Sequence, residues 1–174
     1  MYKRQTERFH LEAEVTKQAY KVKETSLGDP NFVNFDLDEI LSDKNIEDIF
    51  NKIKLNSCSD VGDLNIPAHP ETIYLTVVDK DLNSVSIINS VCYVFGSGIT
   101  TNKSGILLHN RGTNFRVEHG HPNCIEGLKR PLHTIIPGMV IDKDNNTTLS
   151  YGVMGGQYQP VGQVHVLNLS LIHI

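Results

Sequence analysis

The sequence has few cysteines, and they form no recognisable pattern. Cys58, Cys92 and Cys124 are the only ones among 174 residues, and they include no CxxC pair. An odd, sparse set is typical of a reducing compartment such as the cytoplasm and argues against a disulfide scaffold. No His/Cys pair has the spacing of metal ligands, so we expect no metal site. The cellular location otherwise stays open.

Charge of one sign and long apolar runs are also scarce. The net charge is −4, and acidic and basic residues are spread along the chain. A net charge this small and this evenly spread predicts neither nucleic acid nor an anionic membrane as a partner. No apolar run approaches the roughly 20 residues that cross a bilayer, and the opening MYKRQTERFHLEAE has no signal-peptide core. With 39% hydrophobic residues, the chain can form one globular domain or part of a larger one.

The two ends of the chain look foreign to the rest. MYKRQ at the start and LSLIHI at the finish resemble translations of a transposon sequencing adapter read from its two ends. We therefore expect residues 1–5 and 169–174 to carry no biological information, and the native protein to extend beyond both. The alternative is an ordinary start and a short apolar C-terminal strand.

The first third of the sequence predicts helices. Phe9, Leu11, Val15 and Ala19 recur at helical spacing within residues 7–20. Two shorter helices are expected at about 36–41 and 45–54, the second with Ser42 or Asp43 as its N-cap.

A polar linker and a series of strands follow. Residues 56–71 are rich in Asn, Ser, Asp, Gly and Pro and predict an exposed loop. The β-branched runs 72–79 and 84–89 flank a short polar turn and predict a hairpin. The remaining expected elements are strands at 105–109, 132–141 and 147–153 and a helix after Pro160 that includes Gln163–Leu167. Helices followed mostly by strands indicate an α+β fold.

Three features of the strand-rich part are candidates for chemistry. Thr72 opens a strand directly after the polar linker. FGSGI (95–99) and GVMGGQ (152–157) are glycine-rich turns, where backbone N–H groups can approach a ligand. NRG (110–112) and KRPLHT (129–134) place cationic and polar groups beside apolar strands. Taken singly, each has an ordinary structural explanation, such as strand propensity or a tight turn.

In their order and spacing these motifs resemble the γ-glutamyltransferase family across residues 7–168. TIYLTVVDKDLNSVSIINS, which begins at Thr72, is similar to the start of that family's small subunit, and Thr76 takes its Ser/Thr-Val-Val-Asp position. FGSGI, SGILLHNR, HPN, KRPLHTIIP and GVMGGQ follow in the family's order. The upstream helix, Gly-Asp-Pro and polar loop resemble the end of the large subunit. The resemblance therefore divides the chain into a large-subunit region, 6–71, and a small-subunit region, 72–168.

The resemblance implies a precursor that cuts its own backbone between Glu71 and Thr72. The new α-amino group then serves as the general base for the hydroxyl of the same residue. Its unperturbed pKa of about 8 suits that task at neutral pH. Gly155 and Gly156 match the pair whose backbone N–H groups form the oxyanion hole. Ser90 falls where the family has a hydroxyl, usually of threonine, that hydrogen-bonds the nucleophile.

Other positions depart from the family's pattern. Well-characterised γ-glutamyltransferases place an asparagine, a Gln or Glu, and an aspartate around the substrate's α-amino group. This chain has Cys92, Arg111 and Asn114 instead. The pair of serines that contacts the α-carboxylate is replaced by His133-Thr134. Because an arginine cannot accept a hydrogen bond and repels an ammonium, the resemblance supports the reaction type better than the substrate.

We therefore predict a partial four-layer αββα sandwich of the N-terminal-nucleophile hydrolases, acting by acyl transfer through a threonyl ester. The resemblance implies no metal or organic cofactor. It implies as partners a small γ-glutamyl or related amide substrate, water or an amino-acid or peptide acceptor, and the remainder of the two subunits. One rival is an amidohydrolase or acylase of the same superfamily acting on a small amide acid or N-acyl compound, where Arg111 meets a carboxylate. Another is a non-catalytic relic that binds small acids.

Overall fold

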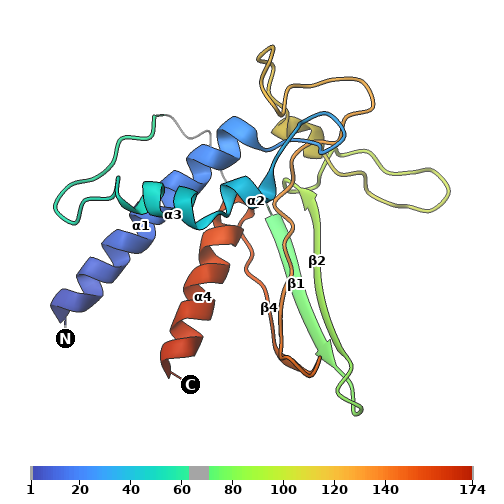
Figure 1. The fold of residues 1–174 in the computed structure, drawn as a ribbon. Coiled ribbons are helices and arrows are strands. Elements are labelled where there is room, and N and C mark those ends of the chain that lie inside the picture. Colours follow the sequence, from blue (N-terminus) through green and yellow to red (C-terminus); the bar gives the residue numbers. More distant parts are fainter. Residues whose placement is uncertain (1, 63–70, 174) are drawn as a thin grey trace. The chain divides into compact units, whose positions relative to one another are not determined.

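The computed structural model describes residues 2–62 and 71–173 (Figure 1). The chain divides into two compact units. The first unit comprises Met1–Asn65 and Phe115–Leu132, and the second comprises Ile66–Asn114 and His133–Ile174. Helices dominate the first unit and strands the second, which confirms the α+β class. Every residue predicted for the site belongs to the second unit.

The first helix, α1 (Tyr2–Ser26), is longer than the predicted 7–20. Good helix formers continue beyond the apolar stripe, and ion pairs on the helix surface, such as Arg8–Glu12 at 2.8 Å, add support. Residues 2–5 lie in α1 and residues 169–173 in the last helix, so the alternative of a C-terminal strand is wrong. The adapter origin of the two ends stays a prediction.

Two short helices follow in the first unit, as expected. They are α2 (Leu37–Ile40) and α3 (Asp43–Phe50). Ser42 is the N-cap of α3, because its side chain accepts a hydrogen bond from Asn45 N at 3.3 Å. The helix ends before the predicted residue 54, because Lys52 N and Ile53 N bond three residues back and tighten the last turn.

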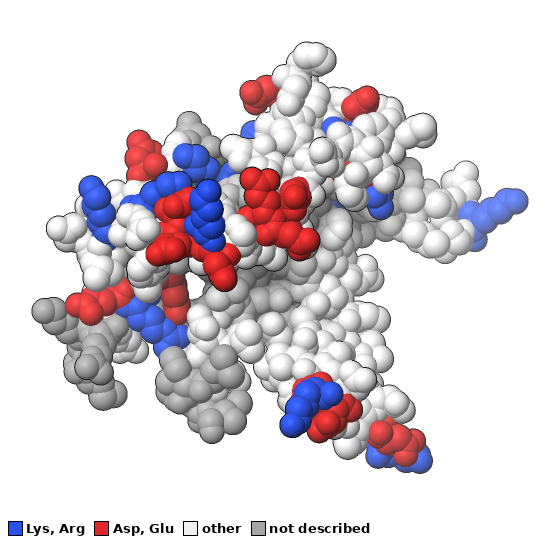
Figure 2. Space-filling view, in the orientation of Figure 1, with Lys and Arg blue, Asp and Glu red and all other residues white. Residues whose placement is uncertain are grey.

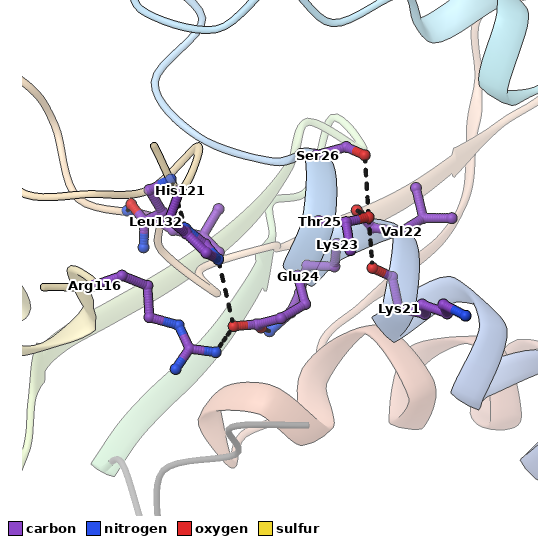
Figure 3. A network of polar contacts seen from close by, with 10 residues as sticks. Lys21, Val22, Lys23, Glu24, Thr25, Ser26, Arg116, His121 and Leu132 are labelled. Atoms are coloured by element: carbon purple, nitrogen blue, oxygen red, sulfur yellow. Dashed lines mark hydrogen bonds and ion pairs between the residues drawn. The ribbon is translucent and has the colours of Figure 1, made fainter. Parts of the chain in front are cut away.

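The first unit is held together by two charged contacts between its distant segments. Asp29, which is 4% exposed, accepts three hydrogen bonds from Arg130, at 2.8, 3.0 and 2.7 Å. These bonds hold the pKa of Asp29 well below its usual range. Near the end of α1, Glu24 forms an ion pair with Arg116, and His121 Nε2 lies 3.8 Å from the same carboxylate oxygen (Figure 3). Segment 115–132 is therefore fixed to the end of α1 and to the residues just after it, about a hundred residues earlier in the chain.

The second unit contains two antiparallel hairpins. Strands β1 (Glu71–Val78) and β2 (Ser84–Cys92) form the first, and β3 (Gly138–Ile141) and β4 (Thr147–Tyr151) form the second. The two connecting turns are built alike. In each, an aspartate, Asp79 or Asp142, accepts hydrogen bonds from the backbone N–H groups two and four residues later, at 2.8–2.9 Å. The predicted 72–79/84–89 hairpin is confirmed.

Side chains, and not a backbone ladder, join the two hairpins. Tyr74 OH shares a hydrogen bond with Ser150 Oγ at 3.2 Å, and Thr76 Oγ1 donates to the same oxygen at 2.8 Å. From β2, Ser86 Oγ donates to Gly138 O at 2.9 Å. Two sheets that face each other make contacts of this kind. Thr76 therefore bridges the hairpins.

The opposite face of the β1–β2 hairpin is apolar and uncovered. Ile73, Leu75 and Val77 on β1 are 70%, 52% and 51% exposed, and Val85 and Ile87 on β2 are each 48% exposed. In the space-filling view the hairpins show uncharged surface, with charged residues at their tips (Figure 2). An apolar strand face of this kind normally packs against another layer.

Two predicted strands differ from the structure. Residues 105–109 form only an isolated bridge, Thr100 with Leu107, because Gly98 and Gly105 adopt positive φ and interrupt a regular ladder. Of the predicted 132–141, only Gly138–Ile141 is a strand. The preceding residues bond to side chains instead: Ile135 N donates to His133 Nδ1 at 3.3 Å, and Ile136 O accepts from Gln163.

The last helix is longer than predicted. The 3₁₀ turn η2 (Gly156–Tyr158) leads directly into α4 (Gln159–His173), which begins one residue before Pro160. Proline is favoured near a helix start because its missing N–H would have no intrahelical partner there. Gly162 lets the helix pack closely on the turn, since a Cβ at that position would meet Val153 and Tyr158 at 2.7 and 2.6 Å.

Candidate functional site

A β-bulge marks the position of Thr72. Glu71 pairs with Cys92 and Ile73 pairs with Asn89, so two residues of β2, Ser90 and Val91, oppose the single residue Thr72. Bulges of this kind re-aim side chains and are common beside active sites. Thr72 is the second residue of β1 and is half-buried. Residues 63–70 of the predicted linker lie outside the described part of the chain, and Glu71 belongs to β1 instead of the loop.

The bulge brings the hydroxyl of Ser90 to the hydroxyl of Thr72. Thr72 Oγ1 donates to Ser90 Oγ at 3.3 Å, and Cys92 N donates to the same oxygen at 3.0 Å. Cys92 is 1% exposed and has a φ of 80°, a conformation that costs energy for a residue with a side chain. Serine at position 90 therefore links the candidate nucleophile to a tightly held backbone turn.

Arg111 lies behind this pair. It opens the 3₁₀ turn η1 (Arg111–Asn114), is 6% exposed, and donates from NH2 to Ser90 O at 3.5 Å. The preceding residue, Asn110, fixes η1 to the bulge: its Oδ1 accepts from Tyr93 N and its N donates to Val91 O, both at 3.1 Å. The structure thus brings together four sequence-predicted residues, namely Thr72, Ser90, Cys92 and Arg111.

Gly155 and Gly156 form the turn between β4 and α4. Their φ angles of 119° and 55° suit glycine alone without strain. Among the described residues we find no hydrogen bond donated by either backbone N–H within the chain, so both remain available to an oxyanion. The chain leading into this turn lies against β1, because a Cβ at Gly152 would lie 2.3 Å from the ring of Tyr74.

Among the described residues, no hydrogen bond joins His133 or Thr134 to this group. Asn114 ends η1 and is half-buried. His133 is exposed, and its Nδ1 accepts the N–H of Ile135. Thr134 is buried. Their binding roles therefore stay predictions.

Sequence reasoning missed three residues that support the site. Tyr74 shares the Thr72 face of β1 and bonds to the second hairpin. Partial burial raises its pKa, but hydrogen bonds with Ser150, Ser86 and Thr76 outweigh that effect, and the net direction is downward. Asn110 holds η1 in place, and the fully buried amide of Gln159 follows the glycine turn without a hydrogen-bond partner among the described residues. Two of the three could have been found from the sequence: Tyr74 lies two residues after Thr72 and so shares its strand face, and Asn110 directly precedes Arg111.

Within residues 2–62 and 71–173, no group of three or more His, Cys, Asp or Glu side chains is arranged to hold a metal ion. Among the helices in those ranges, none has both the length and the apolar character needed to cross a membrane.

Comparison with known proteins identifies relatives along nearly the whole chain. The chain is 33% identical over 170 residues to the glutathione hydrolase-like YwrD proenzyme of Bacillus subtilis, covering 95% of this chain and 31% of the relative. It is 30% identical over 154 residues to the oxamate amidohydrolase proenzyme of Klebsiella pneumoniae, covering 88% and 29%. The chain thus spans about a third of the length of these relatives.

A solved structure resembles the fold as well. The cephalosporin acylase of Bacillus halodurans aligns with a TM-score of 0.80 at 29% identity, over 97% of this chain and 30% of that one. This likeness confirms the predicted fold, part of the N-terminal-nucleophile hydrolase sandwich. The family model described as gamma-glutamyltranspeptidase matches residues 1–173. The chain therefore belongs to the gamma-glutamyltranspeptidase family.

Proposed function

We propose that the complete protein is a γ-glutamyltransferase-like amide hydrolase or acyltransferase whose nucleophile is Thr72. The observation that carries this proposal is the contact between Thr72 Oγ1 and Ser90 Oγ at the bulge. A threonine in an ordinary strand needs neither a bulge opposite it nor a hydroxyl partner. Here the second strand is distorted at that position, and the distortion orients a nucleophile before any substrate binds.

The precursor cleaves itself between Glu71 and Thr72. The Thr72 hydroxyl attacks the carbonyl carbon of Glu71, the acyl group moves from nitrogen to oxygen, and water then hydrolyses the ester. The products are a chain that ends at Glu71 and a chain that begins with the free amine of Thr72. Residues 6–71 would then close the large subunit, and residues 72–168 would open the small one.

The mature enzyme uses the same hydroxyl on its substrate. The α-amino group of Thr72 accepts the hydroxyl proton as Oγ1 attacks the amide carbonyl, and it returns that proton to the departing amine. The N–H groups of Gly155 and Gly156 donate to the oxyanion of the tetrahedral intermediate. Water, or the amine of an amino acid or peptide, then attacks the threonyl ester and releases the acyl group. No step requires a metal or an organic cofactor.

The leading substrate class is a γ-glutamyl amide, and the remainder of the two subunits completes the pocket. The family match and the similarity to a glutathione hydrolase-like proenzyme support this assignment. The second candidate is an amidohydrolase or acylase that acts on a small amide acid or N-acyl compound. Similarity to an oxamate amidohydrolase and to a cephalosporin acylase supports this candidate.

Processing of the complete protein tests the nucleophile. We expect two bands after purification, and Edman sequencing of the smaller fragment should begin Thr-Ile-Tyr-Leu. Thr72→Ala should remain a single band, while Thr72→Ser keeps a hydroxyl and should still process, more slowly. A different N-terminus, or normal cleavage of Thr72→Ala, would exclude Thr72 as the nucleophile. A single band in the wild-type protein would favour the non-catalytic relic.

A further inference from the structure

Arg111 is a buried cation without an anionic partner in the described part of the chain. Its side chain is 6% exposed, and its contact with Ser90 O, at 3.5 Å, is at the limit of a hydrogen bond. Among the described residues no carboxylate forms an ion pair with it. A guanidinium has five donors and stays charged. Burying it unpaired is strongly unfavourable, so an anion is expected beside it.

The position of Arg111 indicates where that anion comes from. Asn110 fixes the start of η1 on both sides of Cys92, through Val91 O and Tyr93 N. The guanidinium contacts Ser90 O, and Ser90 Oγ contacts the nucleophile. These two contacts and the span of one serine place the guanidinium within about 11 Å of Thr72 Oγ1. A short acyl chain bound to Thr72 can reach across that distance.

Two described positions near this cation offer no carboxylate to a substrate ammonium. Cys92 and Asn114, the other two positions that face an α-amino group in the family's pattern, are both without a carboxylate. An ammonium at this place would meet a like charge and no compensating acid. A carboxylate would accept two parallel hydrogen bonds from the guanidinium, which is the geometry that arginine favours.

We propose that Arg111 binds a carboxylate on the acyl part of the substrate. The donors are then monoamides of short dicarboxylic acids that lack an α-ammonium group. This inference rests on the proposed function, because it requires acyl transfer to Thr72. It favours the second candidate, an amidohydrolase or acylase of small amide acids, over a γ-glutamyl amide, because a γ-glutamyl group places an α-ammonium beside the like charge of Arg111.

Three donors with the same leaving group test the proposal on the complete, processed protein. They are glutaryl-p-nitroanilide, γ-glutamyl-p-nitroanilide and the neutral methyl ester of the glutaryl compound. We expect kcat/KM to be highest for the glutaryl donor and at least about ten-fold lower for the γ-glutamyl donor, because removing a like-charge contact in a buried pocket has an effect of that size. A preference for the γ-glutamyl donor by a hundred-fold or more would overturn the proposal.

Arg111→Gln is the matched substitution, since glutamine is one of the residues that the family's pattern has at this position. It should lower kcat/KM for the glutaryl donor by about 10- to 100-fold, mostly through KM, and should lower the ratio of glutaryl to neutral donor by a similar factor. Lys103→Gln, which removes one positive charge from an exposed loop, should leave that ratio unchanged. An equal loss for charged and neutral donors in Arg111→Gln would refute carboxylate binding.

Self-cleavage before Thr72 distinguishes failure of the proposed function from failure of the carboxylate site at Arg111. If no fragment begins at Thr72 and no donor is hydrolysed, the proposed function itself fails. If the fragment forms and donors are hydrolysed, but the donor order or the Arg111→Gln ratio is contrary to expectation, only the carboxylate site fails. Should Arg111→Gln not fold, the order of the three donors on the wild-type enzyme still decides.

Discussion

Replacing Ser90 with alanine is the most direct test of the geometry at the bulge. Ser90 Oγ accepts one hydrogen bond from Thr72 Oγ1 at 3.3 Å and one from Cys92 N at 3.0 Å. Alanine removes the one oxygen that accepts both bonds and adds no new side-chain group to β2. The experiment therefore asks whether the nucleophile depends on a partner that lies eighteen residues away along the chain.

The two lost bonds should have separate consequences. A hydrogen bond between neutral groups contributes about 0.5–1.5 kcal/mol net, so losing the hold on Thr72 alone should slow turnover by about 2- to 13-fold. The Cys92 N–H is deeply buried, and leaving it unpaired costs about 1–3 kcal/mol of stability. If the bulge relaxes as a result, the nucleophile is also misplaced. We therefore expect a total loss in kcat of about 10- to 100-fold, with KM changed less.

Ser90→Thr is the matched control, because it keeps the hydroxyl and carries the residue usual in the family. The complete proteins would be compared for the half-time of self-cleavage by gel densitometry and for kcat on one amide donor. Both rates should fall in Ser90→Ala and be retained in Ser90→Thr. If Ser90→Ala processes and turns over within two-fold of the wild type, the hydroxyl contact has no role in orienting Thr72.

Three further outcomes are expected. Gly155→Ala should reduce kcat about ten-fold or more, because a φ of 119° is strained by about 1–3 kcal/mol for a residue with a side chain. Gly127→Ala, at an open position, should leave kcat unchanged. If Gly155→Ala has the same kcat as the wild type, the oxyanion assignment is refuted. Hydrogen bonds from Lys17 and Ser59 lower the pKa of Glu14 from its ordinary 4.5 to about 2, so the unfolded chain protonates first and stability should be lost as pH falls from about 4.5 toward 2. In thermal melts of the complete protein, Glu14→Gln should make that slope shallower, whereas an exposed Glu47→Gln control should leave it unchanged. The 174-residue chain alone should aggregate and be inactive, because the apolar face of β1 and β2 is uncovered; a cooperative transition in a soluble, monomeric sample would contradict this.

Some parts of the fold were open to prediction because their causes are local. The β1–β2 hairpin follows from two β-branched runs around a turn whose aspartate binds its own backbone. The start of α3 follows from one capping side chain, Ser42. The strands expected at 105–109 and in most of 132–141 are not formed. The backbone groups of the first bond within a loop that glycines interrupt, and those of the second bond in part to the distant side chain of Gln163. The pattern of apolar residues does not predict either arrangement.

The sequence by itself determined the family resemblance, the candidate nucleophile Thr72, and the departures from the family's pattern at Cys92, Arg111 and Asn114. These depend only on the identity and order of the residues, which can be read directly from the sequence. Only the tertiary structure decided that a bulge brings Ser90 to Thr72, and that Arg111 is buried behind them with no counter-ion among the residues that the structure describes. The contact between Ser90 and Thr72 depends on strand register, and the state of Arg111 depends on burial. Both arise only when segments that are distant in the chain pack together and exclude water.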